Sequence, residues 1–180
     1  METVSVLSQI KTYVEEILND YRIVCLSREA SLLGRKEVLS GKAKFGIFGD
    51  GKELAQIAMA KQFREGDWRS GYYRDQTFMM AIDALNVKQY FAALYAHPDT
   101  SKEPSSGGRQ MGGHFSTPTL NPDGSFRELS SLKNSSADIS PTAGQMPRLL
   151  GLAFASKLFR QNTALHSYTN LSNQGNEVAF

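Results

Sequence analysis

Residues 71–77, GYYRDQT, constrain the fold of this chain more than any other stretch. The run that leads into this stretch and overlaps its start, residues 67–72, is rich in the aromatic residues that strands favour. From Asp75 onward the pattern becomes helical. We therefore expect Tyr73 and Arg74 to stand at the end of a strand, where a helix begins. In open α/β sheets, ligands bind in the crevice beyond the carboxyl ends of the strands.

The chemistry of Arg74 admits two interpretations. A guanidinium group at a strand end offers a planar fork of donors that suits a phosphate. Alternatively, Arg74 is an ordinary charged loop residue that pairs with Asp75 or with another surface acid. The stretch by itself leaves both open.

Two further segments carry candidate site residues. Residues 108–115, GRQMGGHF, place His114 in a glycine-rich loop, and residues 140–147 read SPTAGQMP. Glycines let a backbone approach a ligand closely, and a loop histidine can accept or donate a proton near neutral pH. The alternative for His114 is a loop histidine that is simply bonded to backbone.

Hydrophobic periodicity predicts a helix-rich α/β chain. We expect a short N-terminal helical part, residues 1–40, and a second part, residues 41–180, with a few parallel strands. The last residues, 178–180, look like the opening of a buried strand. Residues 98–139 form an irregular stretch, which in a compact domain is either functional or disordered. The expected helices cover residues 4–18, 20–39, 52–63, 75–85, 87–96 and 143–160.

Composition and motifs exclude several classes of protein. The chain has 20 basic and 18 acidic residues and no run of like charge, so it lacks the electrostatic footprint of a nucleic-acid-binding protein. It has no stretch of about 20 apolar residues that could span a membrane. An acidic N-terminus and a single cysteine, Cys25, favour a cytoplasmic location. We find no zinc pattern, P-loop, dinucleotide fingerprint or nucleophile elbow.

Taken together, the motifs resemble those of one enzyme family. The chain looks like the N-terminal part of the α subunit of the thiamine diphosphate-dependent decarboxylase component of 2-oxo acid dehydrogenase complexes. It is more similar to the branched-chain (2-oxoisovalerate) group than to the pyruvate group. The resemblance covers about residues 20–180, and it rests on GKAKFGIFGDGKE, GYYRD, GRQMGGHF and SPTAGQMPRLLGLAFASK, which occur in this order.

The resemblance implies a partial thiamine diphosphate-binding fold and specific roles. Arg74 would bind the cofactor diphosphate, with Tyr73 beside it, and Ser140 and Thr142 would approach the aminopyrimidine. His114 would be the catalytic residue that faces the reacting centre. The substrate pocket would be lined by Phe45, Tyr72 and Met111, together with this histidine.

Metal sites are implied only in part. Pro141 and Gln145 match part of a potassium site of some relatives, but Gly144 replaces a threonine there, which puts that ion in doubt. The Gly-Asp-Gly of residues 49–51 we interpret as a turn before a helix, not as the metal-binding motif of the family. The family's magnesium ligands would lie beyond Phe180. The chain therefore looks truncated, and we expect it to be inactive alone.

The implied reaction is oxidative decarboxylation of a branched-chain 2-oxo acid, with acyl transfer to a lipoyl group. The implied partners are the β region of the same component, fused or separate, and the lipoyl acyltransferase component. Two alternatives remain open. The chain could belong to a pyruvate or acetoin dehydrogenase, or it could be a non-catalytic interaction module or remnant.

Overall fold

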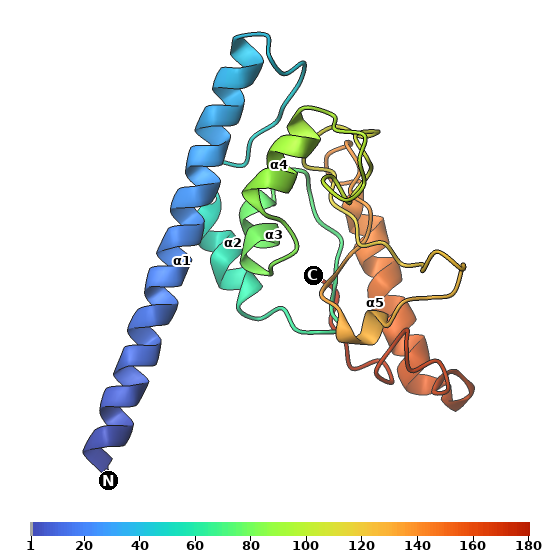
Figure 1. Cartoon of the computed structure of the whole chain (residues 1–180). Helices are drawn as coiled ribbons and strands as arrows, with labels where there is room; N and C mark the ends of the chain where they lie inside the picture. Colours follow the sequence, from blue (N-terminus) through green and yellow to red (C-terminus); the bar gives the residue numbers. More distant parts are fainter. Residues whose placement is uncertain (1) are drawn as a thin grey trace.

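The computed structural model describes residues 2–180, with side chains from Ile10 onward. Helices dominate it, and the small sheet is parallel, which is compatible with the expected α/β class (Figure 1). No helix in the described part of the chain is long and apolar enough to cross a membrane. The elements are α1 (Glu2–Leu39), α2 (Glu53–Ala60), β1 (Trp68–Arg69), α3 (Gln76–Ala81), α4 (Val87–Leu94), η1 (Leu129–Ser131), β2 (Asn134–Ser135), α5 (Gln145–Gln161) and η2 (Thr163–Leu165).

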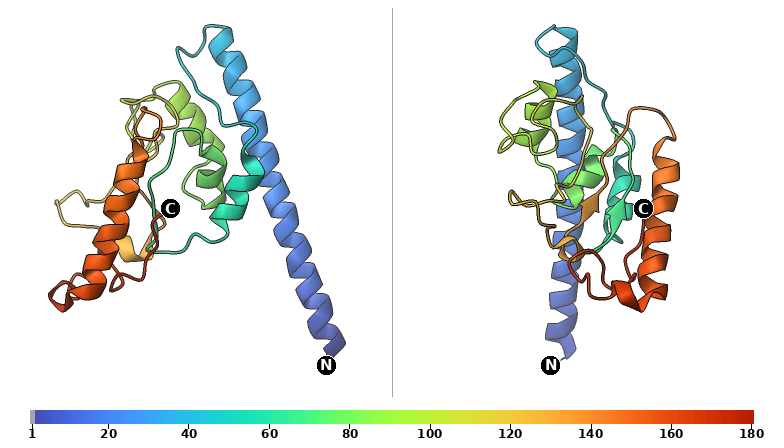
Figure 2. Two further views of the ribbon diagram at one scale, coloured as in Figure 1. Left: turned by 180° about the vertical axis from the view of Figure 1, so that it is seen from behind. Right: turned by 90° about the vertical axis from the view of Figure 1, so that its right-hand side faces the viewer.

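The first two predicted helices are one continuous helix, so the expected break near residue 19 is wrong. Asp20 lies inside α1, and its carboxylate pairs with Lys61 at 2.7 Å. Gly34 does not interrupt α1 either. A Cβ atom at that position would lie 2.5 Å from the Phe48 ring, so the glycine makes room for a packed side chain. The N-terminal half of α1 projects beyond the rest of the molecule (Figure 2).

The core lies where the C-terminal half of α1 packs against α2, α3 and α4. Helix α4 starts where predicted, since Asn86 and Gln89 form a reciprocal capping box with bonds of 3.0 and 2.9 Å. The turn at residues 49–51 before α2 is confirmed. The buried apolar cluster consists of Ala30, Ala60, Phe63, Phe78, Met79, Met80, Ile82, Leu85, Tyr90 and Phe115.

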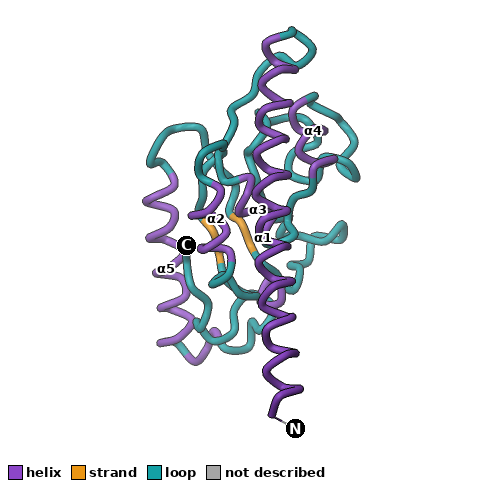
Figure 3. Tube along the Cα trace, turned by 90° about the vertical axis from the view of Figure 1, so that its left-hand side faces the viewer, coloured by secondary structure: helices purple, strands orange, loops and turns teal. Residues whose placement is uncertain are grey.

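The sheet is small, and β1 is its middle strand. On one side β1 pairs in parallel with β2, in the register Trp68 to Asn134 and Arg69 to Ser135. On the other side Trp68 forms an isolated parallel bridge to Ala179, so residues 178–180 pair with β1 as expected but form one bridge and not a full buried strand. In the view of Figure 3, the two strands lie between α5 and α1. Because β1 and β2 are parallel, the loops that follow them leave the sheet at the same edge.

Helix α5 exposes a row of large apolar side chains. Met146, Leu150, Phe154 and Leu158 recur every four residues and remain 63, 73, 56 and 42% exposed. Side chains at this spacing form a ridge along one helix face. The apolar pattern in the sequence of α5 therefore indicates an exposed apolar surface as well as a contact with the rest of the molecule.

Candidate functional site

The three motifs meet beyond the carboxyl ends of β1 and β2. Tyr72 and Tyr73 follow β1, and their hydroxyl groups share a short hydrogen bond, with ring centroids 3.9 Å apart. The Tyr72 hydroxyl also lies 3.4 Å from the hydroxyl of Thr142, in the segment between β2 and α5. The first and third motifs, about 70 residues apart, are thus in direct contact.

His114 connects the second motif to both of the others. Its Nδ1 lies 2.9 Å from the Met111 carbonyl oxygen, and its Nε2 lies 2.9 Å from the Ser140 hydroxyl. A carbonyl oxygen only accepts, so Nδ1 carries the hydrogen, and in the neutral ring Nε2 accepts from Ser140. The imidazole also stacks on the Tyr73 ring at 5.8 Å. The backbone bond that we considered as an alternative is present, and it fixes the tautomer.

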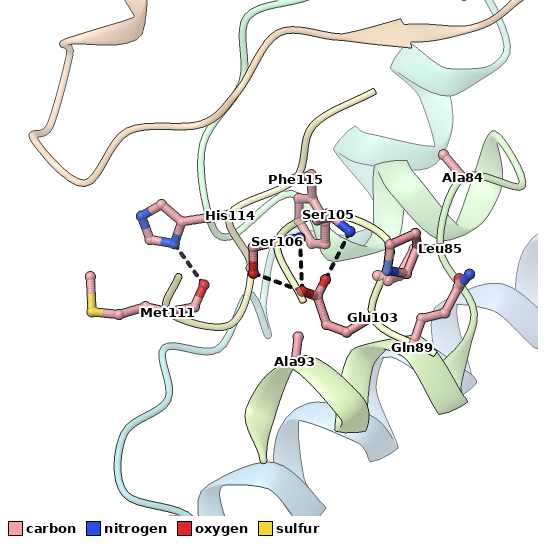
Figure 4. Close-up of a pocket in the computed structure, with 12 residues that line it drawn as sticks. Ala84, Leu85, Gln89, Ala93, Glu103, Ser105, Ser106, Met111, His114 and Phe115 are labelled. Carbon is pink, nitrogen blue, oxygen red and sulfur yellow. Dashed lines mark hydrogen bonds between the residues drawn. The ribbon is translucent and has the colours of Figure 1, made fainter. Parts of the chain in front are cut away.

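A buried carboxylate and a glycine bring the histidine loop into place. Glu103 is 3% exposed and accepts hydrogen bonds from the backbone N–H groups of Ser105 and Ser106, at 3.0 and 2.8 Å (Figure 4). It also accepts one from the backbone N–H of Gly108 at 3.0 Å. Gly113 has φ +85°, and a Cβ there would lie 2.5 Å from the Tyr73 carbonyl oxygen. The loop within residues 98–139 is therefore ordered by specific bonds, and it approaches Tyr73 through a glycine.

Arg74 keeps its cation free of acids within the described part of the chain. Its guanidinium lies 6.0 Å from the Tyr73 ring centroid, and its Nε atom is buried without a hydrogen-bond partner. Its backbone carbonyl is held at 3.0 Å by the Gln56 side chain. Asp75 pairs with Arg69 instead, at 2.7 Å, so the alternative of an Arg74–Asp75 pair is wrong.

Sequence reasoning missed a buried ionic network directly beneath these residues. Arg69 is 3% exposed, and its two terminal nitrogens contact the two carboxylate oxygens of Asp138, each at 3.1 Å. One of them also donates to Asp75, and the other donates to Ser135 at 2.7 Å. Hydrophobic patterning is blind to such residues. Their only sequence signal was an arginine inside an expected strand.

The electrostatics of the cluster follow from these contacts. Hydrogen bonding with Thr142 and then with Tyr73 lowers the pKa of the Tyr72 hydroxyl, while hydrogen bonding with Tyr72 raises the pKa of Tyr73. Burial raises the pKa of the Asp138 carboxyl, although Arg69 acts in the opposite direction. The two tyrosines therefore differ in how readily they donate a hydrogen bond.

Two cavities flank the cluster. One of about 340 Å³ is lined by Met111, His114, Ser140 and Pro141, together with Gln110, Asp138 and Ile139. The other, of about 230 Å³, includes Tyr72 and Gln145 in its lining. The Gln145 Oε1 atom is buried and has no hydrogen-bond partner.

Phe45 is the predicted site residue that the described contacts do not bring into the cluster. It is 48% exposed and lies in the segment between α1 and α2. The described residues also contain no group of three or more His, Cys, Asp or Glu side chains that could hold a metal ion.

Comparison with known proteins first gives the class. The chain is similar to the α subunit of an oxo acid dehydrogenase, which is the resemblance that the motifs suggested. The particular relative is the 2-oxoisovalerate dehydrogenase subunit alpha of Bacillus subtilis (strain 168). The two sequences are 30% identical over an alignment of 155 residues, and the alignment covers 83% of this chain. The chain spans 41% of the length of that relative. No family model matches this chain.

The cluster fits the polar parts of thiamine diphosphate. A diphosphate needs cationic or N–H donors, and Arg74 presents a guanidinium with no acid partner and an unsatisfied buried Nε. Ser140 and Thr142 are exposed, and their hydroxyl groups contact His114 and Tyr72 of the cluster. The donor set suits an anion more than a metal ion.

Proposed function

We propose that this chain is part of the decarboxylase component of a 2-oxo acid dehydrogenase complex and acts on a branched-chain 2-oxo acid. The observation that carries the proposal is that the three motifs meet through contacts among Tyr72, Tyr73, His114, Ser140 and Thr142. The unpaired guanidinium of Arg74 lies 6.0 Å from the Tyr73 ring of this cluster. Similarity to a 2-oxoisovalerate dehydrogenase subunit alpha supports the substrate class.

The residues of the chain divide the work in this proposal. When bound, thiamine diphosphate supplies the electron sink that decarboxylation of a 2-oxo acid requires. Arg74 holds the diphosphate, and Tyr73 packs beside it. His114 and Ser140 both line the 340 Å³ cavity, and there the His114–Ser140 pair exchanges a proton or a hydrogen bond with the substrate. Met111 narrows that cavity and excludes water.

Ligand selectivity tests the proposal. The chain, co-purified with its β chain in magnesium buffer, is titrated with thiamine diphosphate and with thiamine, and the fluorescence of Trp68, the single tryptophan, is followed. We expect thiamine diphosphate to bind at least about 10-fold more tightly, because charge-assisted bonds to a phosphate contribute about 1.5–3 kcal/mol. Equal affinity for the two compounds, or binding of neither by the folded protein, would argue against the function.

The exposed ridge of α5 supports a protein partner. Helix α5 carries Arg148, Lys157 and Arg160 and no acidic residue, and its large apolar side chains face outward. Exposed apolar rows of this kind mark interaction sites. We assign this face to the β region of the same component, and we assign delivery of the acyl group to the lipoyl acyltransferase component.

A double substitution on the ridge tests this assignment. Changing Leu150 and Phe154 to glutamate should weaken association with a co-expressed β chain about 100-fold or more, because a buried Leu or Phe contributes roughly 1.5–3 kcal/mol. Sedimentation velocity measures the effect. Leu39, 81% exposed at the end of α1, provides the control as Leu39→Glu. If both variants bind the β chain equally well, the ridge is not the interface.

A further inference from the structure

The buried carboxylate of Asp138 lies at the junction of all three motifs. It is 4% exposed, and it accepts both terminal N–H groups of Arg69 at 3.1 Å. Its Oδ2 also faces the backbone N–H of Phe115 at 3.3 Å, and its own N–H donates to the Phe115 carbonyl at 3.0 Å. Asp138 therefore contacts the residue that directly follows His114.

Arg69 extends the same connection to the first motif. Besides Asp138, its guanidinium donates to the Tyr72 carbonyl at 2.9 Å and to Asp75 at 2.7 Å. Asp75 in turn accepts the Tyr72 N–H at 2.8 Å. The turn that carries Tyr72 is thus fixed on both its N–H and its carbonyl.

The third motif is joined through the chain itself. Asp138 lies two residues before Ser140, whose hydroxyl contacts His114 Nε2. A displacement of Asp138 would therefore move Phe115 and Ser140 together, and with them both neighbours that set the direction of the imidazole. Planar, bidentate arginine–carboxylate pairs fix geometry in a way that a single bond does not.

We propose that Asp138, held by Arg69, is a positioning residue that sets the orientation of His114 relative to Ser140 and Tyr73. The inference rests on the proposed function only in that these residues form its site. The stated contacts concern the protein without cofactor, so the inference can be tested without any ligand.

The test is nuclear magnetic resonance of the ligand-free chain carrying Asp138→Asn. This change keeps the shape of the side chain but removes the charge that holds Arg69. We expect the imidazole signals of His114 to shift, while those of His97 and His166, which do not touch the network, stay in place. Hydrogen exchange at the Phe115 amide should accelerate about tenfold. The melting temperature should fall by roughly 10 °C.

Asp67→Asn is the matched control. Asp67 is 2% exposed and accepts two backbone N–H groups, from Arg64 at 2.8 Å and Val178 at 2.7 Å, at the other end of β1. Its replacement should also lower the melting temperature, by roughly 5 °C, but leave the His114 signals unchanged. A structural role shared by any buried aspartate would make the two variants alike.

Arg69→Lys gives a second measurement if Asp138→Asn does not fold. It keeps the positive charge but loses the fork, and it should shift the same His114 signals. The inference is overturned if the His114 signals in either folded variant match those of Asp67→Asn. Failure of thiamine diphosphate to bind would contradict the proposed function alone, since none of these measurements involves the cofactor.

Discussion

Replacing Arg69 with methionine is expected to lower the free energy of unfolding by about 3–5 kcal/mol. The substitution leaves the Asp138 carboxylate, whose side chain is fully buried, without its counter-charge. Asp75 is less affected, because 26% of its side chain is exposed to water. Urea unfolding followed by circular dichroism measures the change. If the free energy of unfolding falls with urea concentration at the same slope in Arg69→Met and in the unchanged protein, the two unfold in the same way.

A double variant separates loss of packing from loss of charge compensation. Arg69→Met combined with Asp138→Leu removes both buried charges, and apolar replacements of such pairs are often neutral or stabilising. We therefore expect the double variant to recover most of the stability that Arg69→Met loses. The pair contributes little to the fold if the stability losses of the single variants Arg69→Met and Asp138→Leu simply add in the double variant. The same conclusion holds if Arg69→Met lowers the free energy of unfolding by less than about 1 kcal/mol.

Replacing Arg74 with alanine should have the opposite profile, with a large loss of binding and little loss of stability. Within the described residues its guanidinium makes no ion pair, and the ring contact with Tyr73 contributes about 0.5–1 kcal/mol. Its removal should weaken binding of magnesium thiamine diphosphate by about 10- to 100-fold, because charge-assisted bonds contribute about 1.5–3 kcal/mol. Calorimetric titration and thermal unfolding measure the two effects.

Arg64→Ala is the control for Arg74. Arg64 is exposed and precedes the same strand, so its removal changes the net charge equally without touching the cluster. Arg74→Lys should bind with intermediate affinity, since lysine keeps the charge but loses the fork. If Arg64→Ala and Arg74→Ala weaken binding equally, the effect comes from overall charge, and Arg74 has no specific role.

The sequence predicted the element types well where local chemistry decides them. Part of the run expected as a strand before Tyr73 is present as β1, and Asn86 caps α4 as its side chain allows. Residues 178–180 contribute a single bridge, from Ala179 to β1. The expected break near residue 19 was wrong, since α1 continues through Asp20, whose carboxylate pairs with Lys61 of a distant segment. Local propensity contains no information about such a contact.

The candidate site was predicted as a set of residues but not as a geometry. Motif resemblance selected His114, Ser140 and Thr142, and the structure brings them together with Tyr72 and Tyr73. The sequence could not have indicated Asp138, since a single aspartate in an irregular stretch has no periodicity. The relevant fact is its burial against Arg69, and burial of a polar side chain is decided by the tertiary structure.

The bonds that join the motifs have a consequence for how the protein folds. Helix α1 forms from contacts between residues three or four apart, whereas His114 meets Ser140 across 26 residues and Arg69 meets Asp138 across 69. Contacts between distant residues must first close long loops, so they form late in folding. We expect the site to be the last part of this chain to assemble, well after its helices acquire their circular dichroism signal.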